Sequence, residues 1–563
     1  MRIRDWLRRK VFKQIGMGHR DEAPNDRLTF INDNDEITRM HLEEYNVWYV
    51  GDSDELLNYY TGEQMWQYAY EPIYTRNKRN YFWAINSTEN DIKRTHSGQP
   101  RNIVDTLVNI TPFPLINAGA LGNDDKNIVN VNLQKILKNC NLKEIYRVEQ
   151  LPLTLVEGWG CFKIVWDKDI SDYPVPVYYR AANVEFMHQL GKLVGIVFKD
   201  YYINKDGKKY LKLETRRFEK VCTNPEEPDE ALRNYEQDLV IENELFSYND
   251  DRAEYVNKIS LKDLEETQGI EERVVIGPCD CLFAVPTVIF RNTSAAGGFG
   301  RSIYTGKIDL FDDLDQCLSQ AANAVRRSTV IEYFNSDFLE RDPNTGMPKQ
   351  PKAYDRKYTL YAGQKDANGG STSSDPIQVT QPQLNFQQYS DHAIQILLHI
   401  IDGVMSPATL GIDVAKKDNA EAQREKEKVT IFTRNCVISA EETILAELSR
   451  QLLIALEFMN TGFITFIDYD ISIKYSEFAD DSFENKLEKL GKAYDQEIIS
   501  DKMFMRKLYG DTLSTADFDE ELEWLMEHHT KPRDEGMKGL AGGGANTPGF
   551  LNMDMGEDDE AEL

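Results

Sequence analysis

Hydrophobic residues recur at two different spacings along the chain, and the change between them predicts both kinds of secondary structure. Apolar positions three or four residues apart predict a short helix over 103–110 and a longer one over about 132–157. Between 158 and 255 the period falls to two, with β-branched and aromatic residues at alternate positions, which predicts antiparallel strands. Asp206-Gly207 is the expected hairpin turn between two of these strands. The fold class predicted from this pattern is α+β.

Two further helical patterns enclose a polar insert of short strands. The first covers 302–328 and the second covers 385–405, and both repeat apolar residues at helical spacing. Between them, 329–384 alternates short β-like runs with polar loops and a low-complexity stretch, KDANGGSTSSDP. The first helix is expected to be mostly exposed, because acidic residues occupy much of the surface beside its apolar stripe. These residues are Asp309, Asp312, Asp313 and Asp315.

A segment of small residues joins the second helix to a charged stretch, in the sequence GVMSPATLGIDVAKKDNAEAQREKEK from Gly403. Pro407 cannot continue the hydrogen-bond ladder of the preceding helix, and Gly411 adds backbone freedom. The chain is therefore expected to turn here and to project a loop. Lys416 and Lys417 lie on that loop.

The region after the loop is predicted to be mainly helical. One helix is expected to run from about 420 to Met459, a length of about 60 Å. A strand-like period follows, and then two helices joined at Gly510. The Gly-rich, acidic end from Gly536 is expected to be disordered.

Basic residues surround an apolar helical face at the N-terminus, MRIRDWLRRKVFKQIG. Three interpretations stay open for it: a helix that docks on a partner, a helix on a membrane surface, or a basic helical end with no further role. The polar stretch 33–88 that follows is rich in Tyr and Trp. Such density is typical of a subunit contact or of core packing, and core packing is the favoured interpretation.

Charge restricts the partners of the chain. Its 563 residues include 94 acidic and 65 basic side chains, which give a formal net charge of −29. Most of the surface therefore repels a polyanion, which excludes a general nucleic-acid binder and restricts contact with DNA to local patches. The seven scattered cysteines are typical of a reducing compartment such as the cytosol. No segment approaches the roughly 18 consecutive apolar residues of a membrane span.

Candidate catalytic and metal-binding groups are few. Asp468 and Asp470, or the aspartates of the helix at 302–328, could hold Mg²⁺, but such carboxylates are usually solvated. Cys279 and Cys281 lack a second ligand pair at zinc spacing. The chain has no serine elbow, no His-Glu-x-x-His motif and no phosphate-binding loop. We therefore predict no catalytic residue, no metal, no cofactor and no enzymatic activity.

Five short motifs follow one another in a characteristic order. They are Leu56-x-x-Tyr59-Tyr60-x-Gly62, RNIVDTLV from Arg101, EGWGCFKIVWD from Glu157, VPTVIFRN from Val285 and SPATLG from Ser406. Their order, with a long helix behind the fourth motif, resembles that of the portal proteins of tailed bacteriophages. The resemblance is closest to the group from phages with long non-contractile tails, and it covers about 56–478.

The resemblance implies a ring of about twelve subunits at one capsid vertex, and a plan for each subunit. The implied parts are a basic N-terminal segment (1–30), a wing of helices and antiparallel strands (31–301), a first stem helix (302–328), a β clip (329–384), a second stem helix (385–405), a tunnel loop (406–419), a long wing helix and strand (420–479), crown helices (480–530) and a disordered acidic tail (531–563).

The resemblance also implies partners and a location. The ring would be the channel for genome packaging and ejection, in the virion after assembly in the host cytoplasm. It would dock terminase, the major capsid and scaffolding proteins, and a head-completion or tail adaptor, and it would not bind a membrane. Double-stranded DNA would pass through without base readout. Two alternative functions stay open: a metal-dependent DNA-processing enzyme, and another structural subunit of the virion.

Specific cations would then contact the passing DNA. An acidic wall repels phosphate and so guides DNA without holding it, whereas sparse cations supply local, salt-dependent contacts. Lys416 and Lys417 on the loop would provide them, with Arg326 and Arg327 near the clip. The alternative interpretation is that each lysine is a solvated loop charge. Pro407 and Gly411 would form the hinge of the loop.

Overall fold

The computed structural model describes most of the chain up to Ser476. The described residues are 35–62, 78–85, 92–120, 126–168, 171–189, 192–222, 235–249, 254–291, 300–328, 331–335, 339–347, 357–361, 377–380, 386–412, 427–464 and 469–476, with 490–491, 503–504 and 524. The chain divides into two units, Met1–Ser476 and Glu477–Leu563. The predicted N-terminal segment (1–30) and acidic tail (531–563) lie outside the described residues, as do the crown helices (480–530) except for the isolated helical positions just given.

Aromatic side chains fill the core beneath the N-terminal helices. Trp48, Tyr60 and Trp83 are all at most 1 % exposed, and Trp48 Nε1 donates to the Tyr60 hydroxyl at 2.8 Å. These buried rings confirm the prediction of core packing for the described aromatics of this stretch, whereas 63–77 lies outside the described residues. The helices are α2 (Asp35–Val50), α3 (Ser53–Thr61), the single turn η1 (Lys78–Asn80) and α6 (Gln99–Ile110).

The helix predicted over 132–157 is interrupted. Asn141 has a left-handed backbone with φ 51°, a conformation that asparagine tolerates better than most residues, and it ends the first helical segment. Pro152 then lies in the first turn of the last segment, where its missing N–H is not needed. The segments are α7 (Lys126–Asn139), α8 (Leu142–Ile145), the π-helical turn η2 (Tyr146–Gln150) and α9 (Leu151–Glu157).

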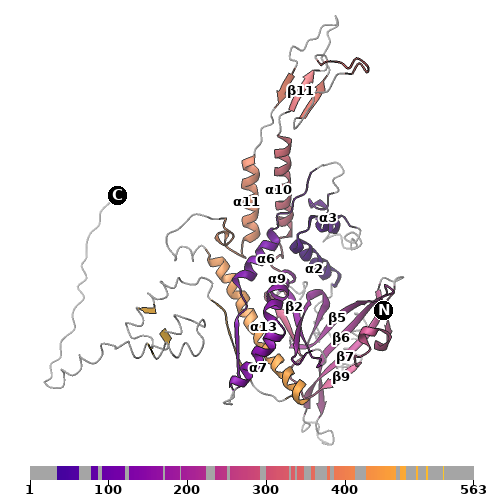
Figure 1. The fold of residues 1–563 in the computed structure, drawn as a ribbon, viewed down its shortest axis with the longest axis vertical. Helices are drawn as coiled ribbons and strands as arrows, with labels where there is room; N and C mark the ends of the chain where they lie inside the picture. Colours follow the sequence, from indigo (N-terminus) through magenta and orange to yellow (C-terminus); the bar gives the residue numbers. More distant parts are fainter. Residues whose placement is uncertain are drawn as a thin grey trace, which may run out of the picture. The chain divides into compact units, whose positions relative to one another are not determined.

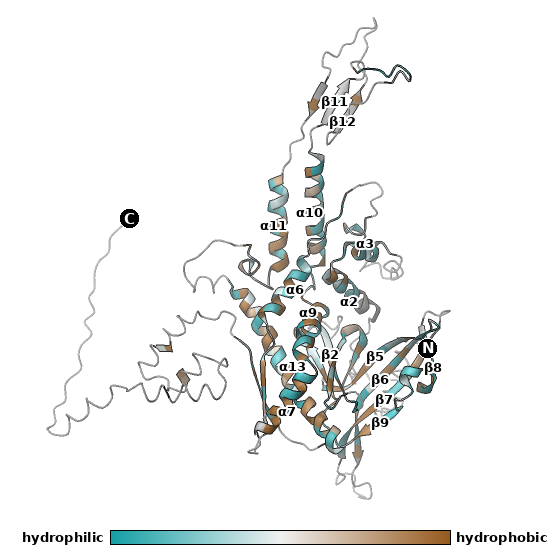
Figure 2. Ribbon diagram, in the orientation of Figure 1, coloured by the Kyte–Doolittle hydropathy of each residue, from teal (hydrophilic) through white to brown (hydrophobic). Residues whose placement is uncertain are grey.

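A six-stranded antiparallel sheet confirms the predicted β region. Its order is β4-β5-β6-β7-β8, and β9 also pairs with β7. Gly207, at φ 75°, lies in the β5–β6 hairpin where the sequence predicts it. Figure 2 shows both hydrophobic and hydrophilic residues along the labelled strands of this sheet. The strands are β4 (Val184–Gln189), β5 (Lys192–Ile203), β6 (Lys209–Cys222), β7 (Tyr235–Asn249), β8 (Glu254–Ile259) and β9 (Arg273–Ile276).

Two smaller antiparallel sheets share the main core with the long helix α13 (Lys428–Thr461). One has the order β10-β2-β3, and the other pairs β1 with β14. Figure 1 shows α7 and α13 beside these strands. Short turns η3 (Ala181–Asn183), η5 (Leu261–Asp263) and η6 (Glu265–Thr267) connect neighbouring strands. The strands are β1 (Leu115–Ala120), β2 (Trp159–Val165), β3 (Val175–Arg180), β10 (Ala284–Val288) and β14 (Tyr469–Lys474).

The two helices predicted around a β insert are present with shorter bounds. The first, α10 (Ile308–Arg327), begins after Gly306, whose φ of 77° breaks the helical pattern. The second, α11 (Phe386–Ile401), ends just before Gly403, at φ 71°. The insert forms a three-stranded sheet in the order β12-β11-β13, with β11 and β12 parallel. These strands are β11 (Ile331–Asn335), β12 (Lys357–Tyr361) and β13 (Ile377–Thr380).

Within the described ranges, no helix has both the length and the apolar character that a membrane crossing requires. The combination of these helices with the sheets makes the chain an α+β protein, as the spacing of its apolar residues predicts.

Candidate functional site

The candidate site is the α10–α11 helix pair with the turn that follows it. The two helices lie side by side and run antiparallel (Figure 1). Lys307, just before α10, donates through Nζ to the carbonyl oxygens of Ile400 (2.6 Å) and Asp402 (2.9 Å) at the end of α11. A cation at this place satisfies helix carbonyls that have no partner of their own. Burial lowers the pKa of Lys307, and Asp402 opposes that shift.

Two aspartates on α10 are buried, which corrects the expectation of a mostly exposed acidic helix. Asp312 is 3 % exposed and Asp315 is fully buried, whereas Asp313 is exposed as expected. The reason is that 81–85 and 92–97 pack against this side of the helix and supply donors to the carboxylates. Their burial therefore depends on a segment more than two hundred residues away in the chain.

Each buried carboxylate accepts hydrogen bonds on both of its oxygens. Asp312 accepts from the backbone N–H of Phe82 at 2.7 Å and of Trp83 at 3.3 Å. Asp315 accepts from Ser97 N (2.8 Å), from Trp83 Nε1 (3.1 Å) and from His96 Nδ1 (2.7 Å). These bonds hold the first half of α10 against the N-terminal region.

Burial raises the pKa of Asp312 to about 7, although the N–H groups of Phe82 and Trp83 oppose the shift. The oxygens that a Mg²⁺ site would need from Asp312 and Asp315 are thus occupied by protein donors. More generally, no group of three His, Cys, Asp or Glu residues that could hold a metal ion occurs among the residues that the structure describes.

The turn after α11 is fastened to the start of α13. Pro407 begins the short helical turn η8 (Pro407–Leu410), and Gly411 ends it with φ 72°. Ser406 N donates to Thr430 Oγ1 at 2.8 Å, and the hydroxyls of Thr409 and Thr430 lie 2.7 Å apart. Thr430 is on the first turn of α13, so the segment between Ile412 and Glu427 has both ends held at one place.

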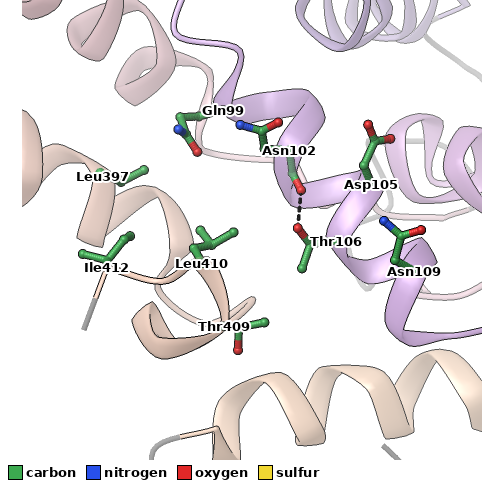
Figure 3. Close-up of a pocket in the computed structure, with 9 residues that line it drawn as sticks. All are labelled: Gln99, Asn102, Asp105, Thr106, Asn109, Leu397, Thr409, Leu410 and Ile412. Atoms are coloured by element: carbon green, nitrogen blue, oxygen red, sulfur yellow. Dashed lines mark hydrogen bonds between the residues drawn. The ribbon is translucent and has the colours of Figure 1, made fainter. Parts of the chain in front are cut away.

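A polar groove of about 430 Å³ lies between this turn and α6 (Figure 3). One wall carries polar side chains from α6, and Thr106 Oγ1 donates to Asn102 O at 2.6 Å there. The other wall is mainly apolar and comes from α11 and from the turn. The lining residues are Gln99, Asn102, Asp105, Thr106, Asn109, Leu397, Thr409, Leu410 and Ile412.

The long helix α13 contains a buried acid. Glu441 is fully buried, and Gln150 Nε2 donates to its Oε1 at 2.8 Å. Burial raises the pKa of Glu441 to about 7, and the bond from Gln150 only partly opposes this shift. Gln150 ends the π-helical turn η2, so this bond joins α13 to the helical segments of 126–157.

A second cluster of charges lies where the six-stranded sheet meets the β10-β2-β3 sheet. Glu214 on β6 lies 2.6 Å from Lys163 Nζ, 3.4 Å from Lys212 Nζ and 2.9 Å from Arg216 Nε. Arg216 Nη1 also donates to the carbonyl oxygens of Ile164, Leu282 and Phe283. Burial alone would raise the pKa of Glu214, but Arg216, Lys163 and Lys212 hold it well below its usual range.

The predicted site residues are only partly brought together. Pro407 and Gly411 belong to the one turn beside Thr430, whereas Lys416 and Lys417 lie outside the described residues. Arg326 is exposed at the far end of α10, about 28 Å along the helix from Lys307 at 1.5 Å per residue. Arg327 is the last residue of α10, and its side chain is outside the description.

Two of the aspartates and the two cysteines considered as metal ligands in the sequence have the following places. Asp470 is exposed on β14, while Asp468 is not among the described residues. Cys279 and Cys281 are buried free thiols.

The groove and the buried aspartates were missed by the sequence analysis, but both leave a signal in the sequence. Gln99, Asn102, Thr106 and Asn109 recur at helical spacing opposite the apolar stripe of α6. On α10, Asp312 and Asp315 directly follow the buried Phe311 and Leu314. Polar residues that border an apolar stripe in this way are candidates for burial.

Comparison with models of known protein families finds no match for the chain, and no curated protein matches its sequence.

Proposed function

We propose that this protein is a portal subunit of a tailed bacteriophage, which forms a ring at one capsid vertex and conducts the genome during packaging and ejection. The observation that carries the proposal is the antiparallel pair α10–α11, with a small sheet inserted between its helices and a fastened turn after them. A helix pair that encloses a β insert matches the stem and clip of such a subunit.

The fastened turn supports the tunnel-loop role of the segment that follows it. The hydrogen bonds that Ser406 and Thr409 form with Thr430 close the base of the loop that contains Lys416 and Lys417. A closed base lets a loop contact a passing molecule while the helices on either side keep their places. Pro407 and Gly411 would therefore form the fixed end of the loop.

Exposed apolar residues on the helix pair support assembly into a ring. Val325 on α10 is 45 % exposed, and Phe386 and Ile394 on α11 are 52 % and 42 % exposed. Figure 2 shows hydrophobic as well as hydrophilic residues along both helices. Neighbouring subunits in a closed ring would cover these side chains, because a cyclic assembly repeats the same pair of contacting surfaces.

The charge of the chain fits a conduit. Each copy has a net charge of −29, so a ring multiplies a charge that repels DNA phosphate. Lys416, Lys417, Arg326 and Arg327 would supply the local contacts with the DNA backbone. Terminase, scaffolding and major capsid proteins, and the head-completion adaptor, are the proposed partners of the ring.

Negative-stain electron microscopy and native mass spectrometry of the purified chain test the proposal. We expect closed rings with a central hole, made of about twelve copies of 64.9 kDa each. Open filaments, or monomers that persist at high protein concentration, would contradict it. Cleavage of plasmid DNA that depends on added Mg²⁺ would instead favour the metal-dependent enzyme.

The two loop lysines can be tested separately. We expect the double change Lys416→Glu with Lys417→Glu to lower the amount of DNA retained in assembled particles while rings still form. The matched control is Lys205→Glu with Lys208→Glu, which makes the same charge change in the exposed β5–β6 turn. Equal DNA retention in the two double variants would show that the loop lysines are ordinary solvated charges.

A further inference from the structure

Two thiols lie in contact below the protein surface. The Sγ atoms of Cys279 and Cys281 are 3.7 Å apart, and Cys279 Sγ also lies 3.1 Å from the Cys281 carbonyl oxygen. The two residues are 1 % and 2 % exposed. A disulfide has an S–S distance of about 2.05 Å, so the two sulfurs must move about 1.7 Å closer together.

The thiol pair lies in a loop that connects three parts of the fold. The loop runs from β9 to β10, and Cys279 N donates to Gln237 O on β7 at 2.8 Å. After the thiols, the Phe283 carbonyl oxygen accepts from Arg216 of β6 at 2.6 Å. Between them, Asp280 forms an ion pair with Arg450 of α13 at 3.1 Å. The loop therefore joins the six-stranded sheet, the β10-β2-β3 sheet and the long helix α13.

The loop that contains the two thiols reaches the protein surface. Gly277 and Asp280, on either side of Cys279, are both exposed, so the thiols lie directly beneath surface residues. Local opening of such a segment requires much less free energy than global unfolding.

The pKa values of the two thiols shift in opposite directions. The hydrogen bond from Cys281 lowers the pKa of Cys279, whereas the same contact raises the pKa of Cys281 well above its usual range. The thiolate is the nucleophilic form of cysteine. Cys279 therefore suits the role of the thiol that attacks an oxidant first, and Cys281 suits the role of the thiol that resolves the product.

We propose that Cys279 and Cys281 form an oxidation site, at which hydrogen peroxide converts the two thiols into a disulfide. The Cys279 thiolate attacks one peroxide oxygen, the O–O bond breaks, and the departing hydroxide takes a proton to become water. The Cys281 sulfur then attacks the sulfur of the resulting sulfenic acid, which releases a second water with the Cys281 proton. Two thiols and one peroxide thus give one disulfide and two waters.

The bond would restrain the loop around Asp280, which holds Arg450 of α13. This consequence concerns the wing of the subunit and stands independently of whether the chain forms a ring. We expect the backbone amides of 279–283 to exchange hydrogen more slowly in the oxidised protein than in the reduced protein.

Mass spectrometry of the folded, full-length chain tests the site. The reduced protein is freed of reductant and titrated with hydrogen peroxide until Cys436 is oxidised. Cys436 is a half-buried thiol and so reports that the oxidant was sufficient. The protein is then denatured, alkylated and digested. We expect the peptide with Cys279 and Cys281 to lose both alkyl labels and to be lighter by two hydrogens, and a phosphine reductant should restore both labels.

Single cysteine variants show which thiol attacks the peroxide and which one resolves the sulfenic acid. In Cys281→Ser, dimedone should trap Cys279 as a sulfenic acid, because the resolving thiol is absent. In Cys279→Ser, Cys281 should stay an alkylatable thiol over the same titration. The proposal is overturned if both thiols of the unaltered chain still alkylate after Cys436 has been oxidised, or if Cys279 proceeds to the sulfinic acid without a disulfide.

Discussion

The junction between the two sheets and the first half of α10 both bury carboxylates, yet they stabilise them in opposite ways. At the junction, Glu214 is surrounded by three cations, which keep it ionised. On α10, Asp312 lies among backbone N–H groups, and its pKa rises to about 7. Burial alone thus does not decide the charge state of an acid, because the charge of its donors decides whether ionisation is favoured.

The difference separates two kinds of structural connection. The cluster around Glu214 depends on charge, so loss of the Glu214 charge leaves Asp200 to compensate Lys163 and Lys212. The bonds on Asp312 and Asp315 depend on the position of an acceptor, so they tolerate loss of charge better than loss of the side chain. Glu441 on α13 resembles Asp312, because its described partner, Gln150, is neutral.

The largest effect is expected when an acceptor is removed from α10. Asp315→Ala leaves three donors unpaired, on Ser97, Trp83 and His96, and should lower the free energy of unfolding by about 4 kcal/mol. Urea denaturation followed by tryptophan fluorescence measures this loss. Asp313→Ala, which removes an exposed carboxylate from the same helix, should change stability by less than about 0.5 kcal/mol. A comparable loss in both variants would contradict the hydrogen-bonding role of Asp315.

Removing the charge of Glu214 without changing its shape should lower the free energy of unfolding nearly as much. Glu214→Gln leaves Lys163, Lys212 and Arg216 without their shared partner and should cost about 3 kcal/mol. The control is Glu185→Gln, which alters the more exposed ion pair with Lys199 and should cost less than about 1 kcal/mol. The same urea titration compares them. If Glu214→Gln were as mild as the control, the three cations would not depend on Glu214.

The dependence of stability on pH should distinguish Glu441 from Glu214. Because the folded pKa of Glu441 is about 7 and an unfolded glutamate titrates near about 4.3, the folded state binds the proton more tightly. This contribution is complete below about pH 4 and is lost as the pH rises through about 7. Glu441→Gln mimics the protonated acid, so it should equal the unaltered chain near pH 4 and be about 3.5 kcal/mol more stable at pH 8.

Unfolding free energies at several pH values give this comparison. A variant that is less stable at every pH would show that the folded state needs the Glu441 carboxylate. Asp312 should add to the slope in the same direction, since its folded pKa is also raised to about 7.

The smallest effect is expected where neither partner is charged. Thr430→Val removes the acceptor for Ser406 N and the contact with the Thr409 hydroxyl, at a cost of about 1 kcal/mol. The amide of Ser406 should also exchange hydrogen faster, which mass spectrometry can follow. Thr443→Val on the same helix removes only an exposed bond to Ser439 O and serves as the control. Unchanged exchange at Ser406 would exclude Thr430 as the fastening point of the turn.

Local patterns were sufficient for much of the fold. The period of two predicted the β region and its hairpin at Gly207, and the apolar repeats predicted α10, α11 and the short strands between them. Bounds were less accurate, because single glycines such as Gly306 and an asparagine in a left-handed conformation interrupt helices that the repeat alone would continue. The turn at Pro407 and Gly411 was predicted, but its attachment to Thr430 was not.

By itself, the sequence determined the α+β class, the acidic net charge and the helix pair around a small β insert, because composition and periodicity are properties of the chain alone. Only the tertiary structure decided that Asp312 and Asp315 are buried, that Cys279 and Cys281 touch, and that Glu441 meets Gln150. Whether a polar residue is buried depends on the segment that packs over it. For Asp312 that segment begins 230 residues earlier, at Phe82, and no local pattern records so distant a partner.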